Sequence, residues 1–196
     1  MGMGDHHEDL PVAARVRQLE ERVIAAGLAT DEELDAVLTR LYATASPVNG
    51  ARMVARGWAD PAYRGRLLAD GNAAAADMGL GDLVSGYRLK VVGNEPGLHN
   101  MIVCTLCSCY PVSLLGPSPS WYKSLAYRSR AVREPRAVLA EFGLRLPEQT
   151  EIAVWDASAE SRYLVLPSRP DEAAGLPEAD LAALVTLGGL IGTAAL

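Results

Sequence analysis

Three cysteines within six residues constrain this chain more than any other feature of its sequence. Cys104, Cys107 and Cys109 are the only cysteines among its 196 residues, and a cysteine thiolate is a strong ligand for soft metal ions. A loop this short must bring the three sulfurs together, so we expect them to share one metal ion. Structural zinc sites combine two Cys-x-x-Cys pairs, or one pair with histidines, and no second pair is present.

The remaining ligands must therefore come from something other than side chains. Two of the three histidines lie near the start of the chain, and His99 lies five residues before Cys104. The nearest further donors are the backbone nitrogens of Ser108 and Cys109. An amide nitrogen binds a metal only after it loses its proton, which requires a strongly Lewis-acidic ion. The sequence favours trivalent cobalt or iron over zinc.

Residues 103–109, called the cysteine loop below, resemble the metal-claw motif of the nitrile hydratase alpha subunit of the cobalt type. The gamma subunit of thiocyanate hydrolase shares this motif. The resemblance extends over nearly the whole chain after the first ten residues. Its further blocks are residues 49–52, 54–61, 67–71, 99–100, 121–124, 127–130, 132–136 and 162–167. Because these blocks occur in the family's order, chance similarity is a poor explanation.

The resemblance implies a role for each residue of the loop. Cys104 would be the axial thiolate, and Cys107 and Cys109 the equatorial sulfurs, which the family oxidises to sulfinate and sulfenate. The backbone nitrogens of Ser108 and Cys109 would complete the plane. One cobalt(III) per subunit is implied rather than iron, because Thr105 stands where iron-type members have serine. Exposed thiolates of low pKa are oxidised most readily, which agrees with this modification.

The implied reaction is the hydration of a nitrile to its amide at a non-corrin Co(III) centre, a hydro-lyase activity. The metal would polarise the nitrile carbon, which water or the sulfenate oxygen of Cys109 would attack. Cys107 is the second catalytic residue that the resemblance implies. Oxidised sulfurs need positive partners, since a buried unpaired anion is costly. In the family these partners are arginines of a beta-type subunit, supplied by one chain or two. A metal-loading activator protein is also implied, and the isolated chain is expected to be inactive.

Arginines downstream of the loop are candidates to support an anionic centre. Arg128 and Arg133 match a family block, and we predict that they and Thr105 surround the metal ligands. For Arg130 and Arg136, an ion pair with a neighbouring glutamate on a solvated helix face is the simpler interpretation.

Two positions depart from the family pattern. Val112 stands where members commonly have tryptophan, and Ser85 stands where many have glutamine near the substrate pocket. Both changes would enlarge the space above the metal. One hypothesis is a bulky heteroaromatic or nucleoside-like nitrile as the substrate, and the other is that a partner side chain or a shifted loop fills the space.

Two further functions stay open. The chain could be a thiocyanate hydrolase gamma subunit, which differs in substrate and partners more than in the loop. It could also be a non-catalytic thiolate metal-binding domain, which would hold a four-coordinate metal without oxidised sulfur. The matching blocks outside the loop argue against this last function.

Composition and charge exclude several kinds of partner. The formal net charge of −6 argues against nucleic acid and anionic membranes. No apolar run reaches membrane-spanning length, and residues 1–7 lack the apolar region of a signal peptide. The odd number of cysteines argues against a secreted disulfide framework, so we expect a cytoplasmic protein.

Residues 1–45 are predicted to form a helical arm that contacts a partner subunit, followed by a globular metal-binding domain at 46–196. An apolar stripe at positions 12, 16, 19 and 23 predicts the first arm helix, and Thr30 with Glu33 forms a capping box for the second. The apolar face could cover its own domain or grip a partner, and the resemblance favours the partner.

The globular region is predicted to belong to the α+β class, because its helices and strands do not alternate regularly. The layered α-β-β-α arrangement of the family agrees with this class. His99 is expected to be a hydrogen-bonded structural residue, and Trp121 and Tyr122 to be packing residues. The prolines and glycine at 111–119 are expected to exclude regular structure. The predicted elements are a helix over 61–78 capped by Asp60, strands at 87–92 and 98–103, a helix from Trp121 interrupted at Pro135, a hairpin of residues 151–156 and 162–167, and a short last helix over 181–187.

Overall fold

The computed structural model describes residues 11–196 and divides the chain into two compact units, Met1–Ala43 and Thr44–Leu196. The predicted arm and the prediction about a signal peptide both include the first ten residues, which lie outside the described part. Within the described residues, no helix is both long enough and apolar enough to cross a membrane.

The described part of the first unit contains two helices, α1 (Val12–Ala25) and α2 (Asp31–Thr44), and the last residue of α2 belongs to the second unit. Gly27, with φ +68°, ends the first helix in the left-handed conformation that glycine adopts most easily. The predicted capping box opens α2: the Glu33 carboxylate accepts from the Thr30 N–H at 2.9 Å, and the Thr30 hydroxyl accepts from the Glu33 N–H at 3.2 Å. This part of the prediction is confirmed.

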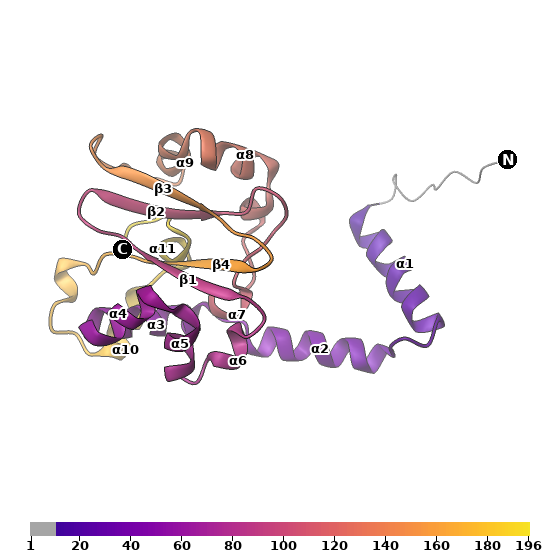
Figure 1. Ribbon diagram of the computed structural model, residues 1–196. Helices are drawn as coiled ribbons and strands as arrows, with labels where there is room; N and C mark the ends of the chain where they lie inside the picture. Colours follow the sequence, from indigo (N-terminus) through magenta and orange to yellow (C-terminus); the bar gives the residue numbers. More distant parts are fainter. Residues whose placement is uncertain (1–10) are drawn as a thin grey trace. The chain divides into compact units, whose positions relative to one another are not determined.

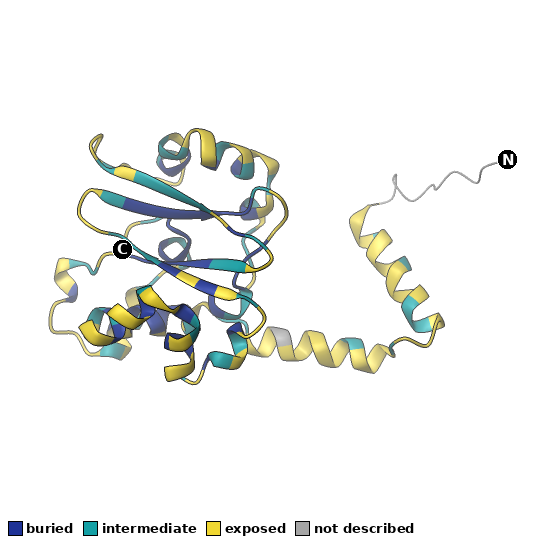
Figure 2. Cartoon of the chain, viewed as in Figure 1, coloured by how far each residue is buried: buried dark blue, intermediate teal, exposed yellow. Residues whose placement is uncertain are grey.

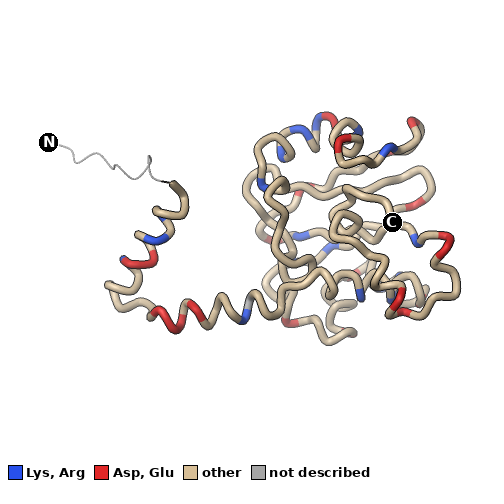
Figure 3. The backbone as a smooth tube through the Cα atoms, turned by 180° about the vertical axis from the view of Figure 1, so that it is seen from behind, with Lys and Arg blue, Asp and Glu red and all other residues tan. Residues whose placement is uncertain are grey.

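Apolar side chains of α1 lie open to solvent (Figure 2). Val12, Val16 and Leu19 are 72%, 57% and 60% exposed, although their spacing is that of a buried helix face. The first turn of α2 is acidic (Figure 3), and its carboxylates interact favourably with the positive end of the helix dipole. Contact of this unit with a partner subunit stays a prediction.

The second unit has four layers of helices and strands (Figure 1). Its two sheets have two strands each: β1 (Arg88–Gly93) pairs with β4 (Ser161–Leu166), and β2 (Leu98–Val103) pairs with β3 (Glu151–Asp156). On the outside of the β2–β3 sheet lie α8 (Leu125–Arg133) and α9 (Pro135–Glu141). On the outside of the β1–β4 sheet lie α3 (Pro47–Ala59), α4 (Pro61–Ala69) and α5 (Gly71–Asp77). The shorter elements are α6 (Gly81–Val84), α7 (Val112–Leu115), η1 (Ser120–Lys123), η2 (Asp171–Ala173), α10 (Glu178–Leu184) and α11 (Leu187–Ile191). The predicted α+β class and its α-β-β-α layers are confirmed.

The predicted hairpin is wrong, although its two strands exist. β3 and β4 follow each other closely in the chain, but each pairs in parallel with an earlier strand in a different sheet. The strand β4 contains the apolar run Tyr163, Leu164, Val165 and Leu166, all buried. A continuous apolar run is typical of a strand covered on both faces, as parallel strands usually are. That signal distinguishes β4 from one arm of an exposed hairpin.

The predicted helix over 61–78 is interrupted at Asp70. The Asp60 carboxylate caps α4 as expected, accepting from the N–H groups of Ala62 and Tyr63. Asp70 is extended, and its carboxylate accepts from the Ala73 N–H at 3.0 Å and caps α5. The extended backbone of Asp70 bends the chain here, and Gly71 lies directly against β1, where a Cβ would be 2.6 Å from the Leu89 carbonyl oxygen.

Three smaller expectations are also corrected. Regular structure is present after the cysteine loop, because α7 fits between Pro111 and Gly116, whose φ is +72°. Trp121 lies in a short 3₁₀ helix, and the following α-helix is capped by Ser124, whose hydroxyl accepts from the Tyr127 N–H at 3.1 Å. The last helix is divided into two pieces, α10 and α11.

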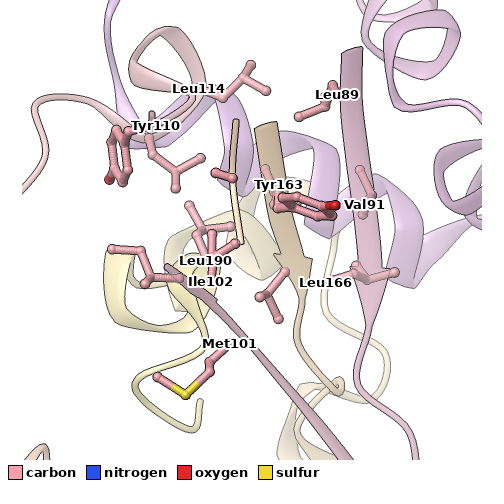
Figure 4. Close-up of a cluster of buried hydrophobic side chains, with 14 of the residues drawn as sticks. Leu89, Val91, Met101, Ile102, Tyr110, Leu114, Tyr163, Leu166 and Leu190 are labelled. Carbon is pink, nitrogen blue, oxygen red and sulfur yellow. The ribbon is translucent and has the colours of Figure 1, made fainter. Parts of the chain in front are cut away.

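The core fills the space between the sheets and their helices (Figure 4). It receives Leu89 and Val91 from β1, Met101 and Ile102 from β2, and Leu190 from α11. These side chains are at most 6% exposed. The strand that leads into the cysteine loop, β2, is therefore anchored in the buried core.

His99 joins β2 to the end of α11. Its Nε2 donates to the Gly192 carbonyl at 2.8 Å, and its Nδ1 accepts from the Asn94 side chain at 3.3 Å. Burial lowers the pKa of His99, which keeps the imidazole neutral. Gly192, with φ +86°, lies so close to β2 that a Cβ would be 2.0 Å from the Asn100 carbonyl. The predicted structural role of His99 is confirmed.

Candidate metal centre

The cysteine loop leaves the carboxyl end of β2 and reaches α7 over a few residues. Its three sulfurs converge: Sγ of Cys107 lies 3.4 Å from Sγ of Cys104 and 3.1 Å from Sγ of Cys109. All three lie within 4.8 Å of one another. One ion can contact all three without rearrangement of the chain, so the donor set fits a bound metal.

Backbone N–H groups point into the same cluster. The Cys107 N–H donates to Sγ of Cys104 at 3.3 Å. Hydrogen bonds from the thiols of Cys109 and Cys104, and from the N–H groups of Cys109 and Ser108, lower the pKa of Cys107 to about 7. Burial raises the pKa of Cys109 to about 12. The two nitrogens expected as ligands thus face the Cys107 sulfur, and Cys107 ionises before Cys109.

The loop is buried at both ends and exposed in the middle. Cys104 and Cys109 are 1% and 8% exposed, whereas Cys107 lies open to solvent. Leu106 is 88% exposed, an unusual position for a large apolar side chain at the edge of a reactive site.

The side chain of Arg128 contacts backbone carbonyls of the cysteine loop. Its Nε donates to the Cys104 carbonyl at 3.1 Å and its Nη2 to the Thr105 carbonyl at 2.7 Å. Arg133, predicted to surround the ligands as well, lies exposed on α8, and its Nε donates to the Ser129 carbonyl of its own helix. The structure therefore brings one of the two arginines to the loop.

The other two arginines are held away from the sulfurs. Arg130 pairs with Glu134 at 2.7 Å and with Glu141 at 2.6 Å, as the simpler interpretation predicts. Arg136 donates to carbonyls of residues 146–150. Basic and acidic residues are interspersed along this part of the surface (Figure 3).

Asp156 is a contact of the loop that the sequence did not predict. Its carboxylate accepts from the Thr105 N–H at 2.9 Å and from the Thr105 hydroxyl at 2.5 Å. The parallel register that pairs Val103 with Asp156 brings the end of β3 beside the start of the loop. Only the strand pairing reveals this contact, and the pairing was predicted wrongly.

Three more side chains missed by the sequence donate to carbonyls around the loop. The Tyr127 hydroxyl donates to Ile102 at 2.6 Å, the Tyr122 hydroxyl to Cys109 at 3.1 Å, and Nη1 of Arg162 to Tyr110 at 2.6 Å. Trp121 and Tyr122 also pack in an aromatic cluster, as expected. No local sequence signal connects these donors to carbonyls up to 52 residues away.

Comparison with known proteins shows the family of this chain. A model of the family "nitrile hydratase, alpha chain" matches residues 10–194. The chain belongs to the nitrile hydratase alpha-chain family. It is 46% identical over 181 residues to the alpha subunit of the low-molecular-weight cobalt-containing nitrile hydratase of Rhodococcus rhodochrous, covering 92% of this chain and 87% of that one.

Other relatives differ in metal and in substrate. A double mutant of the Fe-type nitrile hydratase from Comamonas testosteroni matches with a TM-score of 0.87 and 41% identity, over 94% of this chain and 89% of that one. The thiocyanate hydrolase gamma subunit of Thiobacillus thioparus is 44% identical over 161 residues, covering 77% of this chain and 66% of that one. The fold of the nitrile hydratase alpha chain is therefore compatible with more than one metal and more than one reaction.

The two positions that depart from the nitrile hydratase pattern lie on neighbouring short helices. Val112 is half-buried at the start of α7. Ser85 is exposed at the end of α6, and its hydroxyl donates to the Asp82 carbonyl at 3.0 Å. The two helices pack against each other.

Proposed function

We propose that this chain is the catalytic, metal-binding subunit of a cobalt nitrile hydratase, which converts a nitrile to its amide. The observation that carries the proposal is the convergence of three sulfurs within 4.8 Å, with the N–H groups of Ser108 and Cys109 directed at the middle one. Together these residues offer five donors. A six-coordinate ion held by five donors keeps one position for substrate, which a catalytic site requires.

We propose cobalt(III), one ion per chain, rather than iron as the bound metal. Thr105 is the residue of cobalt-type members, and two relatives of 46% and 44% identity are named cobalt-containing. The Fe-type neighbour shows that the fold alone does not choose between the metals. When bound, the ion supplies Lewis acidity toward the nitrile.

The residues of this chain prepare the sulfurs for oxidation. Cys107 is exposed and its pKa of about 7 gives a large thiolate fraction at neutral pH, which favours its oxidation to the sulfinate by dioxygen, the source of both added oxygens. Cys109 would carry the sulfenate and act as nucleophile or base, with Cys107 beside it. Arg128, Thr105 and Asp156 keep the first half of the loop in place through backbone contacts.

A beta-type partner of one or two chains would complete the site. Oxidised sulfurs need cationic hydrogen-bond donors, yet the guanidinium groups of Arg128 and Arg162 donate to backbone carbonyls. Leu106 and Leu125, 88% and 78% exposed, are apolar surface that such a partner would cover. The free thiols lie only 3.1–3.4 Å apart and need little movement to form a disulfide, which would remove two metal ligands. We therefore further propose that an activator protein delivers the metal before a disulfide forms.

Mass spectrometry and elemental analysis of the same sample test this function. Under non-reducing conditions we expect two added oxygens on Cys107, one on Cys109 and close to one cobalt per chain, with nitrile turnover once the partner is present. Zinc with unmodified thiols, and no turnover after cobalt and partner are supplied, would leave only the non-catalytic metal-binding function.

For the substrate, we propose a bulky heteroaromatic or nucleoside-like nitrile. The short side chains of Val112 and Ser85 support this, because they stand where many family members have large ones. The substitution Val112→Trp should reduce kcat/KM for a heteroaromatic nitrile about tenfold or more, and leave a small aliphatic nitrile nearly unaffected. A parent enzyme that prefers the small nitrile would contradict the proposal.

Thiocyanate hydrolysis is the second candidate function. It is favoured by the 44% identity to the thiocyanate hydrolase gamma subunit and by a TM-score of 0.86 to a thiocyanate hydrolase structure. Turnover of thiocyanate, measured beside the nitriles with the same complex, decides between the two activities.

A further inference from the structure

The backbone at the end of the cysteine loop, at Cys109 and Tyr110, is held by two side chains from distant parts of the chain. The Tyr122 hydroxyl, from η1, donates to the Cys109 carbonyl at 3.1 Å. Nη1 of Arg162, from β4, donates to the next carbonyl, that of Tyr110, at 2.6 Å. Two consecutive peptide groups are therefore fixed just after the last sulfur.

Both donors are themselves fixed by aromatic contacts. Tyr122 is 1% exposed, and its ring meets that of Tyr110 edge to face, with centroids 5.0 Å apart and an interplanar angle of 63°. The Arg162 guanidinium lies 4.9 Å from the centroid of the Tyr87 ring. A planar cation on an aromatic face and a ring in a packed cluster have little freedom to turn. The two hydrogen bonds are thus directed by rigid groups.

We propose that Tyr122 and Arg162 are positioning residues that hold the backbone at the end of the cysteine loop, so that the sulfur and the amide nitrogen of Cys109 meet the metal without rearrangement. This inference rests on the metal site of the proposed function. Cys109 is the residue from which that site takes two donors, so its backbone must be oriented as well as its side chain. Fixing its carbonyl restricts the rotation that would turn the donors away, and a preorganised site binds at lower cost.

The competing explanation is that these side chains only satisfy the carbonyls of a buried segment, as most buried carbonyls are satisfied. The chain contains a matched control for each donor. Tyr63 is also 1% exposed, and its hydroxyl donates to the Ala74 carbonyl at 3.1 Å in another part of the core. Arg136 also donates to a series of backbone carbonyls, between residues 146 and 150.

The test is a titration of the full chain, with its thiols reduced and oxygen excluded, with Co²⁺ alone. Thiolate-to-cobalt charge-transfer absorption reports binding through the three sulfurs, that of Cys109 included. Tyr122→Phe should weaken cobalt binding about fivefold, the equivalent of one net hydrogen bond of about 1 kcal/mol. Tyr63→Phe should lower the melting temperature as much as Tyr122→Phe does, but it should keep the parent's cobalt affinity and absorption spectrum.

Arg162→Lys provides a second measurement that does not depend on the folding of Tyr122→Phe. It should weaken cobalt binding about tenfold and alter the absorption spectrum, because a lysine loses both the planar fork and the stacking. Arg136→Lys should leave both unchanged. Tyr122→Phe and Arg162→Lys chains that bind cobalt like the parent would overturn the positioning role. A parent chain without the absorption would instead refute the metal centre itself.

Discussion

Replacement of Arg128 by methionine separates two arginines that the sequence ranked equally. Methionine keeps the apolar stem of the side chain and removes only the guanidinium, with its hydrogen bonds of 3.1 Å and 2.7 Å to the carbonyls of Cys104 and Thr105. Hydrogen bonds from a charged donor contribute about 1.5–3 kcal/mol each. Arg128 is half-buried, so water replaces part of this, and we expect a loss of about 2–4 kcal/mol in the free energy of unfolding.

The matched control is Arg133→Met, on the same helix α8. The Arg133 guanidinium donates to the carbonyl of Ser129, four residues earlier. Arg133 is exposed and donates only within its own helix, so its loss should change the free energy of unfolding by less than about 0.5 kcal/mol. For a chain of this size, the Arg128 variant should melt about 4–16 °C lower than the parent. Urea unfolding and thermal melting of the two variants, with their cobalt content, provide the comparison. Equal losses of stability and of cobalt in both variants would refute the assignment of Arg128 to the loop.

Three further outcomes follow from single residues. In the metal-free chain, alkylation of Cys107 should rise with pH and reach half its maximal rate near pH 7, which peptide mass spectrometry measures against the buried cysteines; a midpoint near pH 9 would contradict the hydrogen bonding of its sulfur. Because burial lowers the pKa of His99, the stabilising contribution of its neutral imidazole is complete above the unfolded pKa near 6.5 and is lost as the pH falls below that value. In the variant His99→Gln, the urea concentration at the unfolding midpoint should therefore vary less between pH 5 and 7 than it does in the parent. Gly192→Ala should destabilise the fold by about 3 kcal/mol or more, since its Cβ would overlap the Asn100 carbonyl, while Gly175→Ala, with φ +81° and open space, should cost only about 1–2 kcal/mol by thermal melting.

Features predicted correctly from the sequence depend on residues close together in the chain. The capping box of Thr30 and Glu33 spans three residues, and the cap at Asp60 acts on the next turn. The convergence of the three sulfurs is equally local, because a loop of six residues cannot separate them. In each case the geometry follows from spacing and donor chemistry alone.

Features missed from the sequence depend on which strands pair. Two apolar strands separated by a short loop favour a hairpin on local grounds, and the parallel pairings of β3 and β4 depend on competition within the whole core. Asp156 and Arg162 reach the cysteine loop only through these pairings. Tyr122 was predicted as a packing residue; its ring packs, but its hydroxyl direction is set by an acceptor 13 residues away.

The pairing of β2 with β3 also orders events during translation. Residues 104–150 lie between the two strands, so at about 5–20 residues per second the cysteines leave the ribosome some seconds before Asp156 and Arg162. During that interval the loop lacks the contacts of Asp156 and Arg162, although Tyr122 and Arg128 have already been synthesised. We expect released chains truncated after residue 140, which lack β3 and β4, to leave Cys104 and Cys109 more open to alkylation than the full chain does. The geometry that brings Cys104 and Cys109 into the core is therefore expected to form late, after the fourth strand has been synthesised.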